Sequence, residues 1–214
     1  MPALIRVDVG CGSRKVAGAI GLDTARIPGV DIIGDLERGL PLRSDSVDIL
    51  HAYHVVEHVD DFLAAMGEIW RVLKHGGIAH IKAPHGSSPY ATWKDPTHKR
   101  GLEIATFAYF DDTYFDGIAF SYYSPARFRI ELANLRLFAK GAPVPLSSEM
   151  RERIDSGELP WPEPRLFRML RPVLNPLFHA VANRRRGWQY AAERFWGPLV
   201  GIEEVYVVLR AIKD

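Results

Sequence analysis

The chain has 214 residues, of which 47% are hydrophobic and 25% are charged, as in an ordinary globular protein. This balance excludes a disordered chain, a collagen-like repeat and a coiled-coil rod. The 27 Lys and Arg residues nearly cancel the 26 Asp and Glu residues, and a net charge of +1 gives no field that would attract nucleic acid. The length fits one domain with an addition, and we expect a single domain over residues 1–214.

The single cysteine and the first residues bear on the cellular compartment. Cys11 alone cannot form an internal disulfide, and the start Met1-Pro2-Ala3 lacks the basic and apolar regions of a signal peptide. The longest uncharged stretch, residues 172–183, is shorter than the roughly 20 apolar residues that a spanning helix needs. We therefore expect a cytoplasmic protein without an integral membrane segment.

Short apolar runs that stop at glycine or aspartate predict five strands in the first part of the chain. Near-continuous apolar strands that alternate with helical connections are typical of a parallel sheet covered on both faces. The sequence therefore predicts the doubly wound α/β class. The expected strands span residues 4–9, 19–22, 30–33, 47–52 and 78–83.

A helix is clearly marked between the fourth and fifth of these strands. Asp60 is a suitable N-cap, and apolar residues from Phe62 to Leu73 recur at the helical spacing. Lys74 and His75 fit the last turn, and Gly76 fits the position just beyond it.

The composition changes after Pro84. Residues 90–123 are rich in aromatic side chains, and a helix is expected within them over residues 103–110. Residues 128–138 are expected to be extended, and residues 204–212 are expected to form the final strand.

Two further segments separate the extended residues from the final strand. Residues 141–164 contain five prolines and are expected to form a long loop. Residues 165–201 are expected to be helical, and they are rich in arginine and aromatic residues.

A glycine-rich turn, Gly10-Cys11-Gly12, closes the first expected strand. Glycine lets backbone approach a ligand closely, and open α/β sheets bind ligands beside the carboxyl ends of their strands. A dinucleotide-binding turn would need glycine where Lys15 stands, and an acidic residue about 20 positions on. Asp23 comes too early for that role, so binding of NAD is disfavoured.

Acidic residues end the next two strands at the same edge of the sheet. Asp23 can accept hydrogen bonds from both hydroxyls of a ribose, and Asp35 with Leu36 can accept an adenine amino group and cover the ring. The segment from His51 to Glu57 ends the fourth strand at this edge. Together these positions describe an adenosine pocket without a phosphate site.

The ordered series of motifs resembles the class I S-adenosylmethionine-dependent methyltransferases, in particular the small bacterial members of the methyltransferase-11-like group. The resemblance covers about residues 4–84 and implies a seven-stranded, mostly parallel Rossmann-like sheet. It is carried by VDVGCG at residues 7–12, GLD at 21–23, GDL at 34–36, LPLRSDSVDIL at 40–50, HVVEHV at 54–59 and RVLKHGG at 71–77.

This resemblance implies S-adenosylmethionine as the cofactor and gives each motif a role. The turn from Gly10 to Gly12 would hold the methionine end, Asp23 the ribose, and Asp35 with Leu36 the adenine. Residues 1–84 would form the cofactor-binding half, and residues 85–214 the substrate half with an aromatic and helical lid. The full set of expected cofactor-binding residues is Asp8, Gly10, Cys11, Gly12, Asp23, Asp35, Leu36 and His51.

Two features depart from the family pattern. Arg14 stands where the family turn usually carries a third glycine. The connection from Gly10 to Gly18 is shorter than the dozen or so residues of a crossover with a full helix, so we expect a first helix of about one turn. Arg14 or Lys15 could pair with the cofactor carboxylate, and a solvated basic loop is the alternative.

The segment His54-Val55-Val56-Glu57-His58 fits the H-x-x-E-H pattern of inverted zinc proteases. That chemistry needs a helix that presents both histidines on one face. The segment follows a strand directly and has β-branched residues at its centre. We therefore expect structural roles for Glu57 and His58, and we predict no metal site.

Two histidines are candidates for a general base. His85 follows the fifth strand at the cofactor edge, and His98 lies in the aromatic segment that would cover it. Either imidazole could deprotonate a hydroxyl or an amine. A turn at residues 95–98 that only caps the next helix is the alternative for His98.

The predicted reaction is methyl transfer to an oxygen, nitrogen or carbon nucleophile of a small-molecule or glycan-like acceptor. A non-catalytic module that binds S-adenosylmethionine and a NAD-binding oxidoreductase are the alternatives. Clustered arginines and aromatics in residues 165–200 fit either a solvated helix face or weak contact with a membrane surface. A homodimer is left open, and no nucleic-acid partner is expected.

Overall fold

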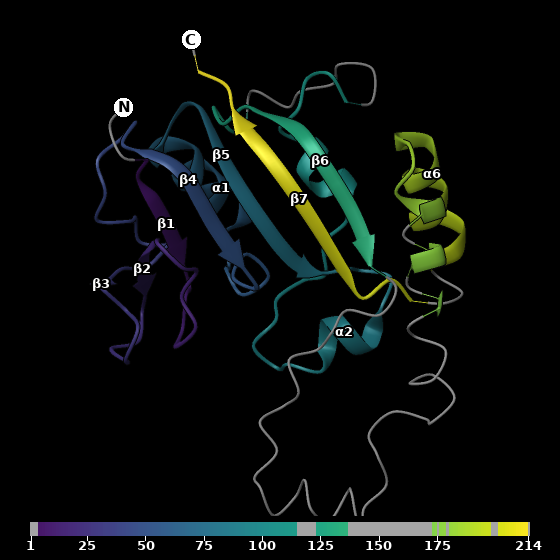
Figure 1. Cartoon of the computed structure of the whole chain (residues 1–214), viewed down its shortest axis with the longest axis horizontal. Coiled ribbons are helices and arrows are strands. Elements are labelled where there is room, and N and C mark those ends of the chain that lie inside the picture. Colours follow the sequence, from purple (N-terminus) through teal and green to yellow (C-terminus); the bar gives the residue numbers. More distant parts are fainter. Residues whose placement is uncertain are drawn as a thin grey trace, which may run out of the picture.

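The computed structural model describes residues 4–114, 123–136, 173–174, 176–178, 180–197 and 201–213. Within them, seven strands form one sheet in the order β3-β2-β1-β4-β5-β7-β6 (Figure 1). Neighbours among the first five strands are parallel, and β7 is antiparallel to both β5 and β6. The strands are β1 (Arg6–Val9), β2 (Ile20–Asp23), β3 (Ile32–Ile33), β4 (Val47–Tyr53), β5 (Leu73–Pro84), β6 (Phe128–Arg136) and β7 (Glu204–Ala211).

This sheet confirms the predicted doubly wound, mostly parallel fold. Each predicted strand is present in the described residues. The first and last residues of the strands lie within two residues of the predicted positions, except that β5 starts earlier than predicted. Turns alone connect β1 to β2, so the expected first helix of about one turn is absent from this connection. The described helices are α1 (Phe62–Val72), α2 (Pro89–Trp93), α3 (Ile104–Ala108), α6 (Arg186–Ala191) and the π-helical turn η2 (Ala192–Trp196).

Both predicted ends of α1 are wrong. The N-cap is one residue later than predicted, and the helix ends before the predicted last turn. Asp61, not Asp60, is the N-cap, and its Oδ1 accepts a hydrogen bond from the Ala64 amide at 2.9 Å. The helix stops at Val72 because Leu73 is extended and pairs with Val47 of β4. Lys74, His75 and Gly76 therefore lie in β5 and not in the helix.

The core lies between the sheet and α1, and it continues to the later strands. Met66 and Ile69 of α1 are completely buried, and the Trp70 indole donates to the Ile212 carbonyl at 2.9 Å beyond the end of β7. The buried apolar cluster runs from Val7 of β1 to Ala211 of β7. Burial on this scale supplies most of the stability of such a sheet.

The aromatic segment divides between the core and the surface. Phe107 and Phe110 are almost fully buried, and the Phe62 and Phe107 rings pack edge to face with centroids 6.0 Å apart. Tyr90 and Trp93 in α2 are exposed. Tyr114 is buried, Tyr109 is partly buried and Tyr123 is exposed. Three further aromatics of the segment lie outside the described residues: Phe115, Phe120 and Tyr122.

Two expectations concern parts of the chain that the structure describes only in part or not at all. The expected long loop, residues 141–164, lies outside the described residues. The expected helical region, residues 165–201, is described in part and contains α6 and η2. None of the helices in the described ranges has the length and apolar character that crossing a membrane requires.

Candidate functional site

A cavity of about 280 Å³ lies where the first four strands end. Its first wall comes from the turns after β1, β2 and β3, and includes Gly10, Asp23, Asp35 and Leu36. The structure therefore brings together four of the eight residues predicted to bind the cofactor. Val9, Thr24, Gly34 and Glu37 complete this wall, and His54, Val55, His58 and Val59 form the opposite one.

Gly10 is required by both conformation and space. Its φ of +65° lies in the left-handed region, and a Cβ there would come within 2.3 Å of Val55 Cγ2. Asp8, near the end of β1, stabilises the connection that contains this turn. Its side chain is buried, and its Oδ2 accepts a hydrogen bond from the Val16 amide at 2.7 Å. Burial raises the pKa of Asp8. Asp8 does not line the cavity, so it supports the turn instead.

Asp23 joins the turns that follow β1 and β2. Its Oδ2 accepts from the Gly12 amide and its Oδ1 from the Ala25 amide, both at 2.9 Å. Each carboxylate oxygen can accept a further hydrogen bond, so the carboxylate can still receive ligand hydroxyls. Cys11 and Gly12 lie outside the cavity lining; Cys11 is buried, and burial raises the pKa of its thiol.

Asp35 and Leu36 form the part of the wall after β3. Asp35 Oδ1 accepts from the Glu37 amide at 2.9 Å, which closes a short turn, and Leu36 is only 6% exposed. The carboxylate thus lies beside an apolar surface, as an adenine ring with its amino group would require. Lys15, a candidate partner for the cofactor carboxylate, instead pairs with Asp31 at 2.5 Å.

His51 lies within β4 and outside the cavity lining. Its Nδ1 is 3.0 Å from the Tyr53 hydroxyl, and its ring stacks on His80 with centroids 5.0 Å apart. Burial, followed by the neighbouring charges of His80, Arg6 and Lys82, lowers the pKa of His51 to about 4. The imidazole is therefore neutral at physiological pH.

The second wall of the cavity comes from the turn after β4, where the sequence predicts structural roles for Glu57 and His58. His54 has a φ of +58°, and its ring nitrogens lie 3.2 Å from Glu57 Oε1 and 3.4 Å from Glu204 Oε2. Burial lowers the pKa of His54, but hydrogen bonds to Glu204 and Glu57 outweigh it and raise the pKa to about 9. This segment is a turn and not a helix, so the geometry of an inverted zinc protease is absent here.

The two candidate bases have different surroundings. His85 is completely buried, with its nitrogens 2.9 Å from Ser87 Oγ and 3.0 Å from Glu193 Oε1. His98 Nδ1 lies 2.7 Å from the Thr92 carbonyl oxygen, and its Nε2 lies 4.0 Å from Glu57 Oε1. The turn predicted at residues 95–98 is present.

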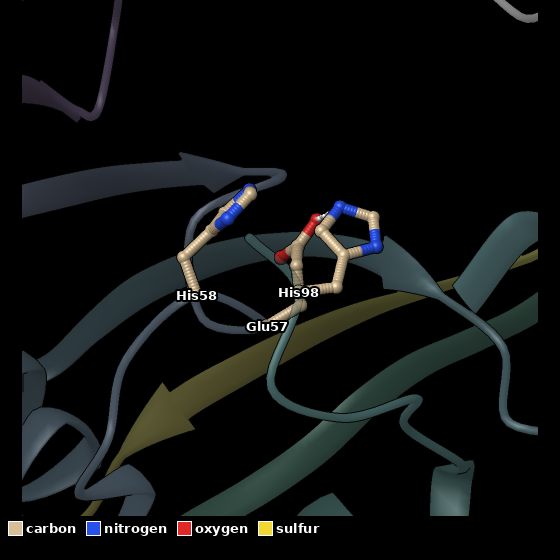
Figure 2. Close-up of side chains that lie close together, drawn as sticks. All are labelled: Glu57, His58 and His98. Atoms are coloured by element: carbon tan, nitrogen blue, oxygen red, sulfur yellow. Dashed lines mark ion pairs between the residues drawn. The ribbon is translucent and has the colours of Figure 1, made fainter. Parts of the chain in front are cut away.

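His98 is brought beside the turn after β4, where it meets Glu57 and His58 (Figure 2). The His58 and His98 rings pack edge to face with centroids 4.7 Å apart. The sequence does not predict this cluster, because His98 is about 40 residues away from Glu57 and His58 along the chain.

Comparison with known proteins finds sequence similarity to methyltransferases in one part of the chain. Residues 7–81 match a family model described as a methyltransferase domain. A probable S-adenosylmethionine-dependent methyltransferase of Mycolicibacterium smegmatis is 36% identical over 84 residues, which are 38% of this chain and 33% of that protein. The chain thus matches about a third of the length of this curated relative.

Solved structures extend the likeness to the whole chain at the level of the fold. A methyltransferase of Archaeoglobus fulgidus that depends on S-adenosylmethionine has a TM-score of 0.52 at 17% identity, over 97% of this chain and 86% of that one. The [4+2]-cyclase SpnF has a TM-score of 0.51 at 14% identity, over 100% of this chain and 77% of that one. Residues 7–81 are therefore similar to the methyltransferase-domain family, and the chain has the Rossmann-like fold of these solved structures.

Proposed function

We propose that the protein is an enzyme that transfers a methyl group from S-adenosylmethionine to a small-molecule or glycan-like acceptor. The observation that carries this proposal is the cavity at the strand ends, where Gly10, Asp23, Asp35 and Leu36 form one wall within the family-matched segment. Two carboxylates and an apolar cover at this edge fit an adenosine group.

The residues of the cavity fit the three parts of the cofactor. Asp23 would accept the ribose hydroxyls, Asp35 would accept the adenine amino group, and Leu36 would cover the ring. Gly10 lines the cavity and would present its backbone to the methionine end, since a side chain at this position would collide with Val55. Asp8, Cys11, Gly12 and His51 stay in the proposal as supporting residues rather than residues of the cavity wall.

S-adenosylmethionine, when bound, supplies a sulfonium methyl group that a nucleophile attacks in line, with the sulfur as the leaving group. The task of this chain is therefore to align the acceptor, to exclude water and to remove a proton where the acceptor needs it. We assign residues 1–84 to the cofactor and residues 85–214 to the acceptor and the lid, within a single domain. The acceptor atom is oxygen, nitrogen or carbon.

His98 and His85 are the proposed proton acceptors. The Thr92 carbonyl can only accept a hydrogen bond, so His98 Nδ1 carries the proton and its Nε2 has a free lone pair. Both His85 nitrogens have close polar neighbours, Ser87 and Glu193, in a fully buried position. These contacts favour His98 over His85 for direct contact with an acceptor.

The partner and location of the protein are also proposals. The single cysteine supports a cytoplasmic location. Trp188 and Phe195 are exposed near Arg184, Arg185 and Arg186, which supports weak contact with a membrane surface as one role of residues 165–200. A homodimer is the other partner proposed for this chain.

Calorimetric titration of the full chain with S-adenosylhomocysteine, and separately with NADH, tests the cofactor. We expect binding of the sulfur nucleoside and no response to NADH. Tight binding of NADH alone would contradict the proposal and favour an oxidoreductase.

Turnover distinguishes an enzyme from a non-catalytic binding module, since both bind the cofactor. Acceptors from saccharide, lipid-linked and small-metabolite classes would be incubated with the protein and S-adenosylmethionine. Mass spectrometry would then detect the gain of one methyl group, and a boiled protein sample is the control.

A further inference from the structure

Three side chains of metal-binding type converge beside the proposed cofactor cavity. Glu57 and His58 belong to the turn after β4, and His98 belongs to the loop between α2 and α3. One ligand atom from each lies within 4.8 Å of the others (Figure 2). Of the three, His58 lines the cavity, so the cluster adjoins the cavity through this residue.

The Glu57 carboxylate has an unsatisfied oxygen. The side chain is completely buried, and its Oε1 lies 3.2 Å from His54 Nδ1. Its Oε2 has no hydrogen-bond partner among the described residues. Burial of a carboxylate oxygen without a partner is costly, so this position favours a bound cation.

Both imidazoles are held with a lone pair on Nε2. His98 Nδ1 donates to the Thr92 carbonyl at 2.7 Å. The Thr97 hydroxyl donates to Asp95 Oδ1 at 2.6 Å, so it must accept the hydrogen bond from His58 Nδ1, which lies 2.9 Å away. Metal-binding histidines are typically fixed in this way, with one ring nitrogen donating to an oxygen and the other facing the metal.

Backbone contacts hold the two segments of the cluster together. The Lys99 amide donates to the Glu57 carbonyl at 2.8 Å. The Arg100 guanidinium donates to the Val59 and Asp60 carbonyls, also at 2.8 Å. The three side chains therefore stand on a loop and a turn that are tied to one another.

We propose that Glu57, His58 and His98 bind a divalent first-row transition metal ion. Two imidazoles and one carboxylate suit such an ion and leave coordination positions open. Ligand atoms bonded at about 2.1 Å lie about 3–3.5 Å apart, so these atoms, which lie within 4.8 Å of one another, would have to approach by at most about 1.3–1.8 Å. The proposal differs from the expectation drawn from the sequence, which predicts no metal site.

A metal ion at the cavity wall would select the atom that is methylated. This step depends on the proposed function. A hydroxyl of the acceptor would bind the metal, which lowers its pKa, and its proton would leave to solvent. The oxygen would then form a bond to the methyl carbon as the carbon–sulfur bond breaks and its electron pair stays on sulfur. His98 would be a ligand in this reaction rather than the base, and the acceptor atom would be oxygen.

Metal binding can be tested without any acceptor. The full chain, free of any affinity tag and treated with a chelator, would be titrated with Co²⁺ and followed by the visible absorption of the ion, and with Zn²⁺ by calorimetry. We expect one equivalent to bind. We expect Glu57→Gln and His98→Gln to weaken this binding at least 10-fold.

Two further variants keep the test decisive if a buried substitution disturbs folding. His58→Gln changes the ligand at the cavity wall and should also weaken metal binding at least 10-fold. Thr97→Val leaves all three ligands in place but removes the acceptor of the His58 hydrogen bond, together with the hydroxyl that donates to Asp95, and we expect about 10-fold weaker binding. His75→Gln, in β5 and outside the cluster, is the matched control and should bind the metal as the wild type does.

The outcomes separate this inference from the proposed function. Failure of the wild type to bind a stoichiometric metal ion, or equal binding by the folded ligand variants, would overturn the metal site. Binding of S-adenosylhomocysteine by the same metal-free protein would leave the methyltransferase proposal intact. Metal binding without nucleoside binding would contradict only the proposed function.

Discussion

Asp23 combines a structural and a ligand-binding task in one carboxylate. It already accepts two backbone amides, from Gly12 and Ala25. We expect Asp23→Ala to weaken binding of S-adenosylmethionine by about 1.5–3 kcal/mol, since charged hydrogen bonds to ribose are lost. Calorimetric titration would measure the change, and circular dichroism would confirm the fold.

Asp35→Ala is the comparison for this variant. We expect a smaller loss, because Asp35 serves one amino group whereas Asp23 serves two hydroxyls. Wild-type affinity in a folded Asp23→Ala protein would show that the cavity is assigned incorrectly.

Gly10 and Gly12 offer a matched pair within one turn. Both have positive φ, so alanine at either position costs about 1–2 kcal/mol of conformational strain. Only at Gly10 does the new Cβ meet a neighbour, Val55, whereas nothing lies within 4 Å at Gly12. We expect Gly10→Ala to lower the free energy of unfolding more than Gly12→Ala and to reduce nucleoside binding more strongly. Urea denaturation and calorimetry would measure both, and equal effects would contradict the role of the Val55 contact.

The sequence predicts which residues come together at the cavity where a strand end fixes their position. Gly10, Asp23 and Asp35 follow strands whose apolar runs are plain, so the edge of the sheet brings them together. The direction of a side chain is harder to predict, and Asp8 points beneath the turn rather than into the cavity. His98 could not be placed beside Glu57, because that proximity depends on a loop held by the Arg100 and Lys99 contacts.

Among the elements, α1 shows how local and tertiary effects compete. Its apolar stripe predicts the helix correctly, since periodicity depends only on local sequence. Its end could not be predicted in the same way, because Leu73 leaves the helix to pair with Val47 in the sheet. The Leu73 pairing is a long-range contact, and the nearby Gly76 resembles an ordinary helix stop.

The same helix contains a glycine that packing does not require. A Cβ at Gly67 would meet nothing within 4 Å. We expect Gly67→Ala to raise the free energy of unfolding by about 0.8–1.0 kcal/mol, because alanine has the higher helix propensity. Thermal and urea unfolding would measure the gain.

Gly34→Ala is the control for that substitution. Its Cβ would lie 2.9 Å from both Leu22 Cδ2 and Pro41 Cδ, so we expect a loss of stability instead. If both variants raised the free energy of unfolding, the side chains around Gly34 would have to move aside without loss of stability, which would contradict this expectation.

For the molecule as a whole, the half-buried imidazoles of His51 and His80 in the sheet predict how stability depends on pH. The unfolded chain protonates His51 near pH 6.5, but the folded chain does so only near pH 4. Protons therefore favour the unfolded state across this range. The contribution of His51 to the free energy of unfolding is lost as pH falls from about 6.5 towards 4. Burial lowers the pKa of His80 as well, which acts in the same direction.

Urea denaturation at several pH values would test this expectation. We expect the midpoint to fall between pH 7 and pH 5, and we expect His51→Gln to reduce the slope of that fall. An unchanged slope in the variant would show that other groups dominate the acid sensitivity.

The position of β7 between β5 and β6 has a consequence for synthesis of the protein. Within the described sheet, β6 is an edge strand that pairs with β7, yet β7 follows it by about 70 residues. A ribosome adds ~5–20 residues per second, so β6 waits several seconds for its partner. During that time the free edge of β5 and the apolar residues of β6 are both open to other chains. The sheet can be completed only after most of the chain has been translated. We therefore expect the exposed strands of the nascent chain to bind chaperones.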